Sequence, residues 1–265
     1  MGMGDEIMAA GIAEKLFRDT GQPVAIRDRN GQARTHAVWE NNPAIDAKAD
    51  QHITNAAGAR PYIRRWHGGP RIEYDEEFRN DLHPAGPLHI SEPVKLWETW
   101  SHHMTAGAVL IQKTVKRGGS TGKDWGASKW DEVERILHAN DVACISIAEK
   151  ASGGNTPEII TPTPQHAAAI IASVALVLCP EGGIHHLAGA MGTPALVYCG
   201  GFISPETISY SGQMYIYAGG EACGVWNNCA HCDEFRREVT PKEVASQALT
   251  MLHSITTRER SHNAA

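Results

Sequence analysis

The chain has 265 residues, which is enough for one large domain or two modest ones. Its 42% hydrophobic and 20% charged residues indicate a packed globular core and exclude a disordered chain. The formal net charge of −6 argues against a duplex nucleic-acid partner, which usually demands a basic face. No apolar run approaches the roughly 20 residues of a membrane span, and no basic-then-apolar signal precedes the first acidic residues, so we expect a cytoplasmic protein without a transmembrane segment.

The N-terminal segment has the pattern of a turn, a helix and a strand. A glycine-rich turn at residues 1–6 leads into a helix whose apolar residues, from Ile7 to Phe17, fall on one face. The Gly21-Gln22-Pro23 sequence ends this helix, and residues 24–26 are predicted to form a short buried strand. A parallel sheet normally has a strand before its first glycine turn, and this chain starts at the turn. We therefore expect a reduced N-terminal α/β domain whose first strand is missing.

Residues 28–105 show no sustained period, and short strands are predicted only at 72–74 and 88–90. From residue 108 onward, apolar strands alternate with helical segments, so we expect a mostly parallel sheet covered on both faces. A domain boundary is predicted near residue 105. The predicted strands cover residues 109–111, 142–147, 175–179 and 195–198. The predicted helices start at Ser128, Thr163, His185 and Thr240, the last with a capping box to Glu243.

The loop from Lys113 to Lys123 follows the first of these strands and is rich in glycine and positive charge. Glycines let backbone N–H groups approach an anion, and Lys116, Arg117 and Lys123 add positive potential, which suits a diphosphate. The loop is not a Walker loop, because arginine stands at the first glycine position and Asp124 follows the last lysine. The alternative is a solvated basic loop.

Two further loops carry carboxylates beside glycines. Glu181, Gly182 and Gly183 connect a buried strand to a helix, where the N–H groups can bind an anion and the carboxylate can accept hydrogen bonds from sugar hydroxyls. A zinc site of Glu181 with His185 and His186 is disfavoured, because adjacent histidines on a helix point in different directions. In the N-terminal turn, Asp5 is either a general base or a helix cap.

Three stretches together form a recognisable pattern. They are Gly4-Asp5 before the first helix, Lys123-x-Trp125, and Glu-Gly-Gly-x-x-His at 181–186 followed by a small-residue helix and Gly-Thr-Pro at 192–194. This pattern resembles glycosyltransferase family nine, the ADP-heptose:lipopolysaccharide heptosyltransferases and their relatives. The resemblance covers residues 108–205 well, is fragmentary in the first 30 residues and is slight elsewhere.

The resemblance implies the GT-B fold, in which two Rossmann-like α/β domains with parallel sheets face a cleft. It implies an acceptor-side N-terminal domain over residues 1–105, reduced here, and a nucleotide-sugar-binding Rossmann-like domain over residues 106–265. The family inverts the configuration at the anomeric carbon of the transferred sugar. A nucleotide-diphosphate sugar is therefore the expected donor.

The resemblance also implies roles for individual residues. The family's catalytic aspartate matches Asp5, and its phosphate-contacting lysine matches Lys123. Its phosphate-binding hydroxyl, donor-binding turn and histidine match a further set, namely Thr114, Glu181, Gly182, Gly183 and His186. Two members of that set depart from the family pattern, because Glu181 replaces aspartate and Gly182 replaces serine or threonine. The first departure lengthens the side chain by a methylene, and the second removes a hydroxyl.

A cluster of three cysteines and a histidine lies near the C-terminal end, as Cys223-x5-Cys229-x2-Cys232 with His231 in between. These four residues are a candidate zinc set. Only one pair has metal-ligand spacing, whereas strong zinc signals usually have two such pairs. The sequence therefore favours reduced structural thiols without a bound metal.

We accordingly predict a metal-independent, inverting glycosyltransferase that needs no cofactor besides its sugar-nucleotide co-substrate. Lys123 stabilises the leaving diphosphate, and Asp5 removes the proton of the acceptor hydroxyl. Two alternatives stay open: a sugar-nucleotide epimerase on the same fold, and a non-catalytic nucleotide-sugar or nucleic-acid binding module. The sequence does not identify the sugar, the nucleotide or the acceptor, which can be a glycan, a lipid-linked sugar or another hydroxyl compound.

Overall fold

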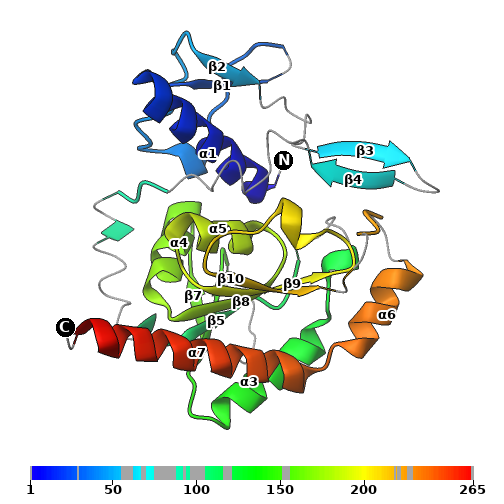
Figure 1. Cartoon of the computed structure of the whole chain (residues 1–265). Helices are drawn as coiled ribbons and strands as arrows, with labels where there is room; N and C mark the ends of the chain where they lie inside the picture. Colours follow the sequence, from blue (N-terminus) through cyan, green and yellow to red (C-terminus); the bar gives the residue numbers. More distant parts are fainter. Residues whose placement is uncertain are drawn as a thin grey trace.

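The structure is a computed structural model, and its arrangement is shown in Figure 1. It describes residues 2–28, 30–54, 62–66, 70–74, 88–91, 94–95, 105–115, 121–150, 156–217, 219, 222–225 and 229–263. The Lys116 and Arg117 predictions lie outside these residues.

The N-terminal segment begins with helix α1 (Met3–Thr20), as the sequence predicts. This helix ends at Gly21, whose left-handed backbone (φ 70°) closes the last turn. The chain then enters β1 (Ala25–Arg27), which pairs in parallel with β2 (His52–Thr54). The 3₁₀ helix η1 (Ala37–Trp39) lies between these two strands in sequence. An antiparallel hairpin of β3 (Tyr62–Trp66) and β4 (Pro70–Tyr74) follows, whereas residues 88–90, predicted as a strand, form none.

All six strands of the main sheet run in parallel. Their bounds are β5 (Val109–Ile111), β6 (Cys144–Ala148), β7 (Glu158–Ile160), β8 (Leu176–Pro180), β9 (Ala195–Gly200) and β10 (Gln213–Tyr217). The spatial order is β7-β6-β5-β8-β9-β10, which is the doubly wound order of Rossmann folds. Four of these strands were predicted within two residues, and β7 and β10 were not predicted.

Helices connect and cover the strands of this sheet. Their bounds are η3 (Thr121–Lys123), α3 (Ala127–His138), α4 (Pro164–Ser173), α5 (Gly183–Met191), η4 (Pro205–Thr207), α6 (Ala230–Glu238) and α7 (Pro241–Asn263). The predicted caps of α4 and α7 are confirmed, since Thr163 accepts from the His166 N–H and Thr240 forms its capping box with Glu243. The predicted cap at Ser128 is wrong, because Gly126 is the N-cap of α3.

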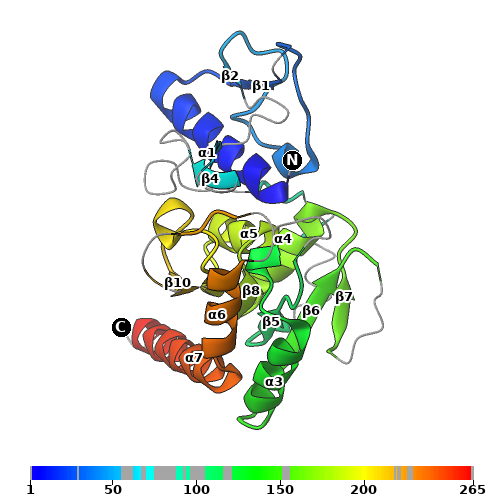
Figure 2. The ribbon, with the colours of Figure 1, turned by 90° about the vertical axis from the view of Figure 1, so that its right-hand side faces the viewer.

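Side chains alternate between two hydrophobic layers along each central strand, as the period of a strand requires. In β5, Val109 and Ile111 face one layer and Leu110 faces the other. Helices α3 and α7 pack against each other over the first layer, and α4 and α5 cover the second (Figure 2). Both layers are continuous and nearly free of exposed apolar residues, so the sheet is a rigid base for the loops at its edges.

The N-terminal segment packs on the α4 and α5 side of the sheet and shares its core with it (Figure 1). Within this segment, the buried carboxylate of Glu6 pairs with Arg34 at 2.6 Å, and the Trp39 indole N–H donates to the Glu6 carbonyl at 2.8 Å. These contacts fix the first turns of α1 against residues 34–39. Among the described helices, none combines the length and the apolar character that crossing a membrane requires.

Candidate functional site

The sheet order places two of the predicted loops side by side. Strand β5 lies next to β8, and the chain moves outward from β5 in one direction and from β8 in the other. This is the topological switch point, where loops separate and leave a crevice beyond the carboxyl ends of the strands. The loop that ends at Lys123 follows β5, and the turn that begins at Glu181 follows β8. The two candidate anion-binding segments therefore meet at the position where this fold binds ligands.

Lys123 and Glu181 form an ion pair at this point. Glu181 is almost fully buried, with 2% of its side chain exposed, and its N–H donates to the Tyr198 carbonyl at 2.9 Å. The Lys123 side chain is 19% exposed, and its ammonium also lies 5.0 Å from the centre of the Phe202 ring. The sequence predicts that the Glu181 carboxylate accepts hydrogen bonds from sugar hydroxyls; in the structure this carboxylate pairs with Lys123.

The two histidines of α5 are buried beside this pair. Burial lowers the pKa of His186 well below its usual range, so the imidazole is neutral. Its Nδ1 lies 2.6 Å from the Tyr210 hydroxyl, and its Nε2 lies 3.8 Å from the Glu181 carboxylate. A hydrogen bond from Tyr210 to Nδ1 leaves the N–H on Nε2, facing that carboxylate.

His185 is also buried, and burial lowers its pKa to about 4. Its Nε2 donates to the Ile208 carbonyl at 2.9 Å. The sequence argument that adjacent histidines diverge is wrong here, because the two rings lie 4.3 Å apart and both come within 4.8 Å of Glu181. The Lys123 ammonium already neutralises this carboxylate, which disfavours a cation at the same place.

The first turn of α1 packs directly against α5 (Figure 2). A Cβ atom at Gly4 would lie only 2.2 Å from Cδ2 of His186, so no larger residue fits without a shift. Asp5 follows Gly4 in this turn, so it lies near the same site although it belongs to the N-terminal segment. The contact is close enough that the positive charge of Lys123 influences the pKa of the Asp5 carboxyl.

The Asp5 carboxylate accepts a hydrogen bond from the Gly2 N–H at 3.0 Å, which is the reciprocal half of a capping box. The capping prediction for Asp5 is thus borne out locally. Burial raises the pKa of this carboxyl above its ordinary value. The Gly2 N–H and the positive charge of Lys123 lower this pKa, but their effect is smaller than that of burial. A carboxylate with a raised pKa is a better proton acceptor, so capping and a role in proton transfer are compatible here.

The glycines of the β8–α5 turn differ in their surroundings. Gly182 is the N-cap of α5, and among the described residues no atom other than those of its chain neighbours lies within 4 Å of the place where its side chain would stand. A Cβ at Gly183 would lie 2.6 Å from the terminal carbon of Met3. A helix N-terminus without a side chain at its N-cap is the kind of place where backbone N–H groups bind anions.

Thr114 lies on the exposed loop after β5, where the Gln112 amide donates to its hydroxyl at 3.4 Å. The structure therefore joins Asp5, Lys123, Glu181 and His186 in one cluster, whereas Thr114 lies exposed at the start of the loop that ends at Lys123. Sequence reasoning missed Phe202 and Tyr210, which pack against Lys123 and His186. Both follow β9 in irregular segments, and no motif marks them.

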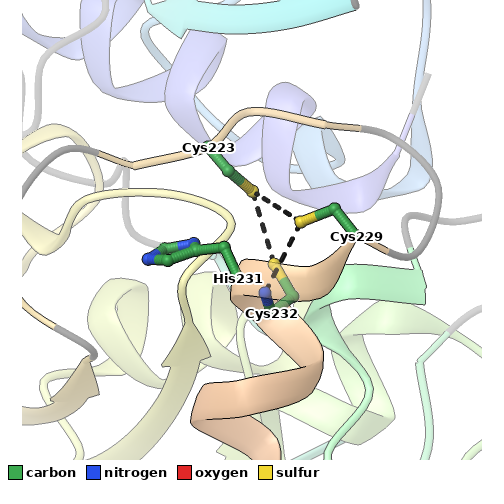
Figure 3. Close-up of side chains that lie close together, drawn as sticks. All are labelled: Cys223, Cys229, His231 and Cys232. Atoms are coloured by element: carbon green, nitrogen blue, oxygen red, sulfur yellow. Dashed lines mark hydrogen bonds between the residues drawn. The ribbon is translucent and has the colours of Figure 1, made fainter.

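A second cluster lies at the start of α6, where the ligand atoms of Cys223, Cys229, His231 and Cys232 all come within 4.8 Å of one another (Figure 3). Sequence spacing alone favoured separate structural thiols. The structure brings all four side chains of the candidate zinc set together, which the spacing of Cys229 and Cys232 alone does not predict.

No family model matches this chain, and no curated protein matches it. Several solved structures match it. TibC, the iron-containing dodecameric glycosyltransferase from enterotoxigenic E. coli H10407, matches over 97% of this chain and 77% of its own, with 15% identity and a TM-score of 0.63. E. coli ADP-heptose lipopolysaccharide heptosyltransferase II matches over 96% of this chain and 97% of its own, with 12% identity and a TM-score of 0.61.

The family nine glycosyltransferase from Veillonella parvula DSM 2008 matches over 96% of this chain and 95% of its own, with 12% identity and a TM-score of 0.60. At these identities the similarity establishes the fold. The chain therefore has the GT-B-like α/β fold of heptosyltransferases and other family nine enzymes, and the resemblance predicted from its motifs is confirmed at that level.

Proposed function

We propose that this protein is an inverting glycosyltransferase that moves a sugar from a nucleotide-diphosphate sugar to an acceptor hydroxyl. The observation that carries the proposal is the meeting of Asp5, Lys123 and the 181–186 turn at the switch point of the sheet. Three segments far apart in the chain converge there, and each supplies one element that transfer from a diphosphate requires. The similar solved structures, which are glycosyltransferases by name, support the same class.

The leaving diphosphate is placed beside Lys123 and the N-terminus of α5. As the glycosidic bond breaks, negative charge grows on the phosphate oxygens, and the ammonium and the N–H groups near Gly182 stabilise it. Glu181 holds Lys123 in position through their ion pair. These groups supply the positive charge of the transfer step, so we propose that the step itself is metal-independent.

The acceptor hydroxyl is placed on the side of Asp5. A carboxylate there removes the proton as the oxygen attacks the anomeric carbon from the face opposite the diphosphate, which inverts the configuration. The half-buried position of Asp5 raises its pKa, which favours this role. The N-terminal segment over residues 1–105 then serves as the acceptor side, and residues 106–265 as the donor side, of a protein that we place in the cytoplasm.

The first experiment identifies the donor. A thermal-shift screen against nucleotide sugars should raise the melting temperature for one nucleotide class, because a ligand that binds only the folded state stabilises it by mass action. Incubation of that donor with and without candidate acceptors separates transfer from the alternatives. An epimerised sugar with donor alone would contradict transfer, and so would a donor that binds but is never turned over with any acceptor.

The second experiment tests Asp5. Asp5→Asn should lower turnover by roughly 10²–10⁴-fold, the usual contribution of positioned proton transfer, and leave donor affinity nearly unchanged. The amide oxygen of asparagine can still accept the hydrogen bond from the Gly2 N–H, so the melting temperature should move little. Asp19→Asn, at the exposed end of the same helix, is the matched control and should keep full activity. A fully active Asp5→Asn protein would refute the general-base role.

A further inference from the structure

Three thiols and an imidazole meet where the chain enters α6 (Figure 3). Cys223 comes from the preceding segment, Cys229 is the N-cap of α6, and His231 and Cys232 lie in its first turn. The Cys223 sulfur lies 3.3 Å from that of Cys232 and 3.6 Å from that of Cys229. The Cys232 side chain is buried, and the other two cysteines pack against the same core.

The sulfur spacings fit a tetrahedral metal site. With metal–sulfur bonds of about 2.3 Å, two thiolates on one tetrahedral ion lie about 3.8 Å apart. The observed separations are slightly shorter than this and much longer than the roughly 2.05 Å of a disulfide. A disulfide would also join only two of the three cysteines, whereas one ion can bind all of them.

The chemistry of the donor set favours a thiophilic transition metal such as zinc. Thiolates and imidazoles are the ligands of zinc and related transition metals, while Mg²⁺ and Ca²⁺ require oxygen ligands. The backbone N–H of Cys232 approaches the Cys229 sulfur at 3.5 Å, and the N-terminus of a helix stabilises a thiolate at that place. Three sulfurs and one nitrogen form a common structural zinc set.

The cluster is linked to the candidate donor site through the turn after β9. The Cys223 N–H donates to the Gly201 carbonyl, and the Gly224 N–H donates to the Phe202 carbonyl, both at 2.9 Å. The His231 ring lies directly on Gly201, since a Cβ there would come within 2.3 Å of His231 Cε1.

Phe202 is buried, and its ring lies 5.0 Å from the Lys123 ammonium. The cysteine cluster, the 201–202 turn and Lys123 thus form one continuous series of contacts. We propose that Cys223, Cys229, His231 and Cys232 bind one structural Zn²⁺ ion, and that this ion holds the 201–202 turn in place behind Lys123. The ion is a positioning element: it touches neither donor nor acceptor.

The first test is the metal content of the full chain, purified without a metal-binding tag. Elemental analysis should find about one zinc per chain. Cys229→Ser should lower this to less than about 0.1 per chain, while Cys229→His should restore binding, because imidazole is also a zinc ligand. Cys144→Ser is the matched control, since Cys144 is a buried thiol outside the cluster, and should retain full zinc content.

The result for the parent protein stands even if a variant fails to fold. A parent protein that contains neither zinc nor another transition metal would overturn the proposed site. Iron in place of zinc would overturn the assignment of the ion. Replacement by Co²⁺ should give the intense visible absorption of tetrahedral cobalt–thiolate coordination. A spectrum without thiolate bands would contradict cysteine ligation.

The second test addresses positioning and does not depend on glycosyl transfer. Removal of the ion by a chelator should speed amide hydrogen exchange of residues 201–203 at least about tenfold, with α7 unchanged as the internal control. Gly201→Ala should weaken zinc binding at least about tenfold, because the added methyl displaces His231. Unchanged exchange on metal removal would refute the positioning role even if zinc is bound.

Discussion

The ion pair of Lys123 and Glu181 allows a test that separates folding from donor binding. Lys123→Met removes the ammonium and keeps an unbranched side chain of similar length. It leaves Glu181, of which only 2% is exposed, as a buried carboxylate without its cation. Breaking a buried ion pair in this way costs about 3–5 kcal/mol of unfolding free energy. The folded state of a typical domain is stable by roughly 5–15 kcal/mol, so the variant should fold with a melting temperature lower by roughly 10 °C.

A second substitution should recover this loss. In the double variant Lys123→Met with Glu181→Gln, the residue at 181 is neutral, and an amide is far less costly to bury than a carboxylate. We expect most of the 3–5 kcal/mol to return. Donor affinity should not return with it. Loss of one charged hydrogen bond to the diphosphate is worth about 1.5–3 kcal/mol, which corresponds to a roughly ten- to hundred-fold weaker Kd in both variants.

The assay combines urea unfolding with calorimetric titration of the nucleoside diphosphate that most stabilises the parent protein. Lys113→Met is the matched control, because this lysine belongs to the same loop but its ammonium is held by Asp131 and Glu134 of α3, both at 2.6 Å. It should keep the parent's affinity. If affinity recovers together with stability in the double variant, Lys123 acts only as a partner of Glu181 and the phosphate role is refuted.

The packing of α1 on α5 and the buried histidines give two further predictions. Gly4→Ala should cost about 1–3 kcal/mol of unfolding free energy, because the added methyl meets the His186 ring. Gly183→Ala should cost less, because its methyl meets the flexible side chain of Met3. Urea unfolding of the two variants compares these costs. Burial keeps His185 and His186 neutral in the folded protein, so below pH 6.5 the unfolded chain binds more protons than the folded one. The stability that these neutral imidazoles contribute above pH 6.5 is therefore lost as the pH falls. By pH 5 the loss should reach about 2 kcal/mol for each imidazole, and urea midpoints that do not change between pH 7.5 and 5 would contradict their burial as neutral groups.

The central sheet could be predicted because its strands carry a strong local signal. Strands β5, β8 and β9 are continuous apolar runs, typical of parallel strands buried on both faces, and helix α4 between them begins at a recognisable threonine cap. The two outer strands carry a weaker signal. Strand β7 has only three residues, one of them exposed, and β10 mixes exposed and buried positions at the sheet edge.

The pairing of Lys123 with Glu181 could not be predicted from local sequence. Each residue was assigned separately, one to phosphate and one to hydroxyl groups, because their loops are distant in the chain. Only the strand order, which puts β5 next to β8, brings them together. The convergence of the cysteine cluster could not be predicted for a similar reason. Spacing identified Cys229 and Cys232 as a pair, but Cys223 joins them through a backbone contact with Gly201 that no spacing rule describes.

The two departures from the family nine pattern lie next to each other in the structure, and together they have a physical consequence. Glutamate at 181 has one methylene more than the aspartate of the pattern, and its carboxylate engages Lys123. Gly182 has no hydroxyl, and no described residue beyond its chain neighbours fills the place of a side chain there. The turn thus has no side-chain hydroxyl beside the N-terminus of α5, and its buried carboxylate pairs with Lys123 of the loop after β5. If the proposed function holds, a donor at this turn would meet fewer fixed hydrogen-bonding groups but a firmly oriented charge, so we expect electrostatic stabilisation of the diphosphate to contribute more to transfer here than side-chain hydrogen bonds from the turn.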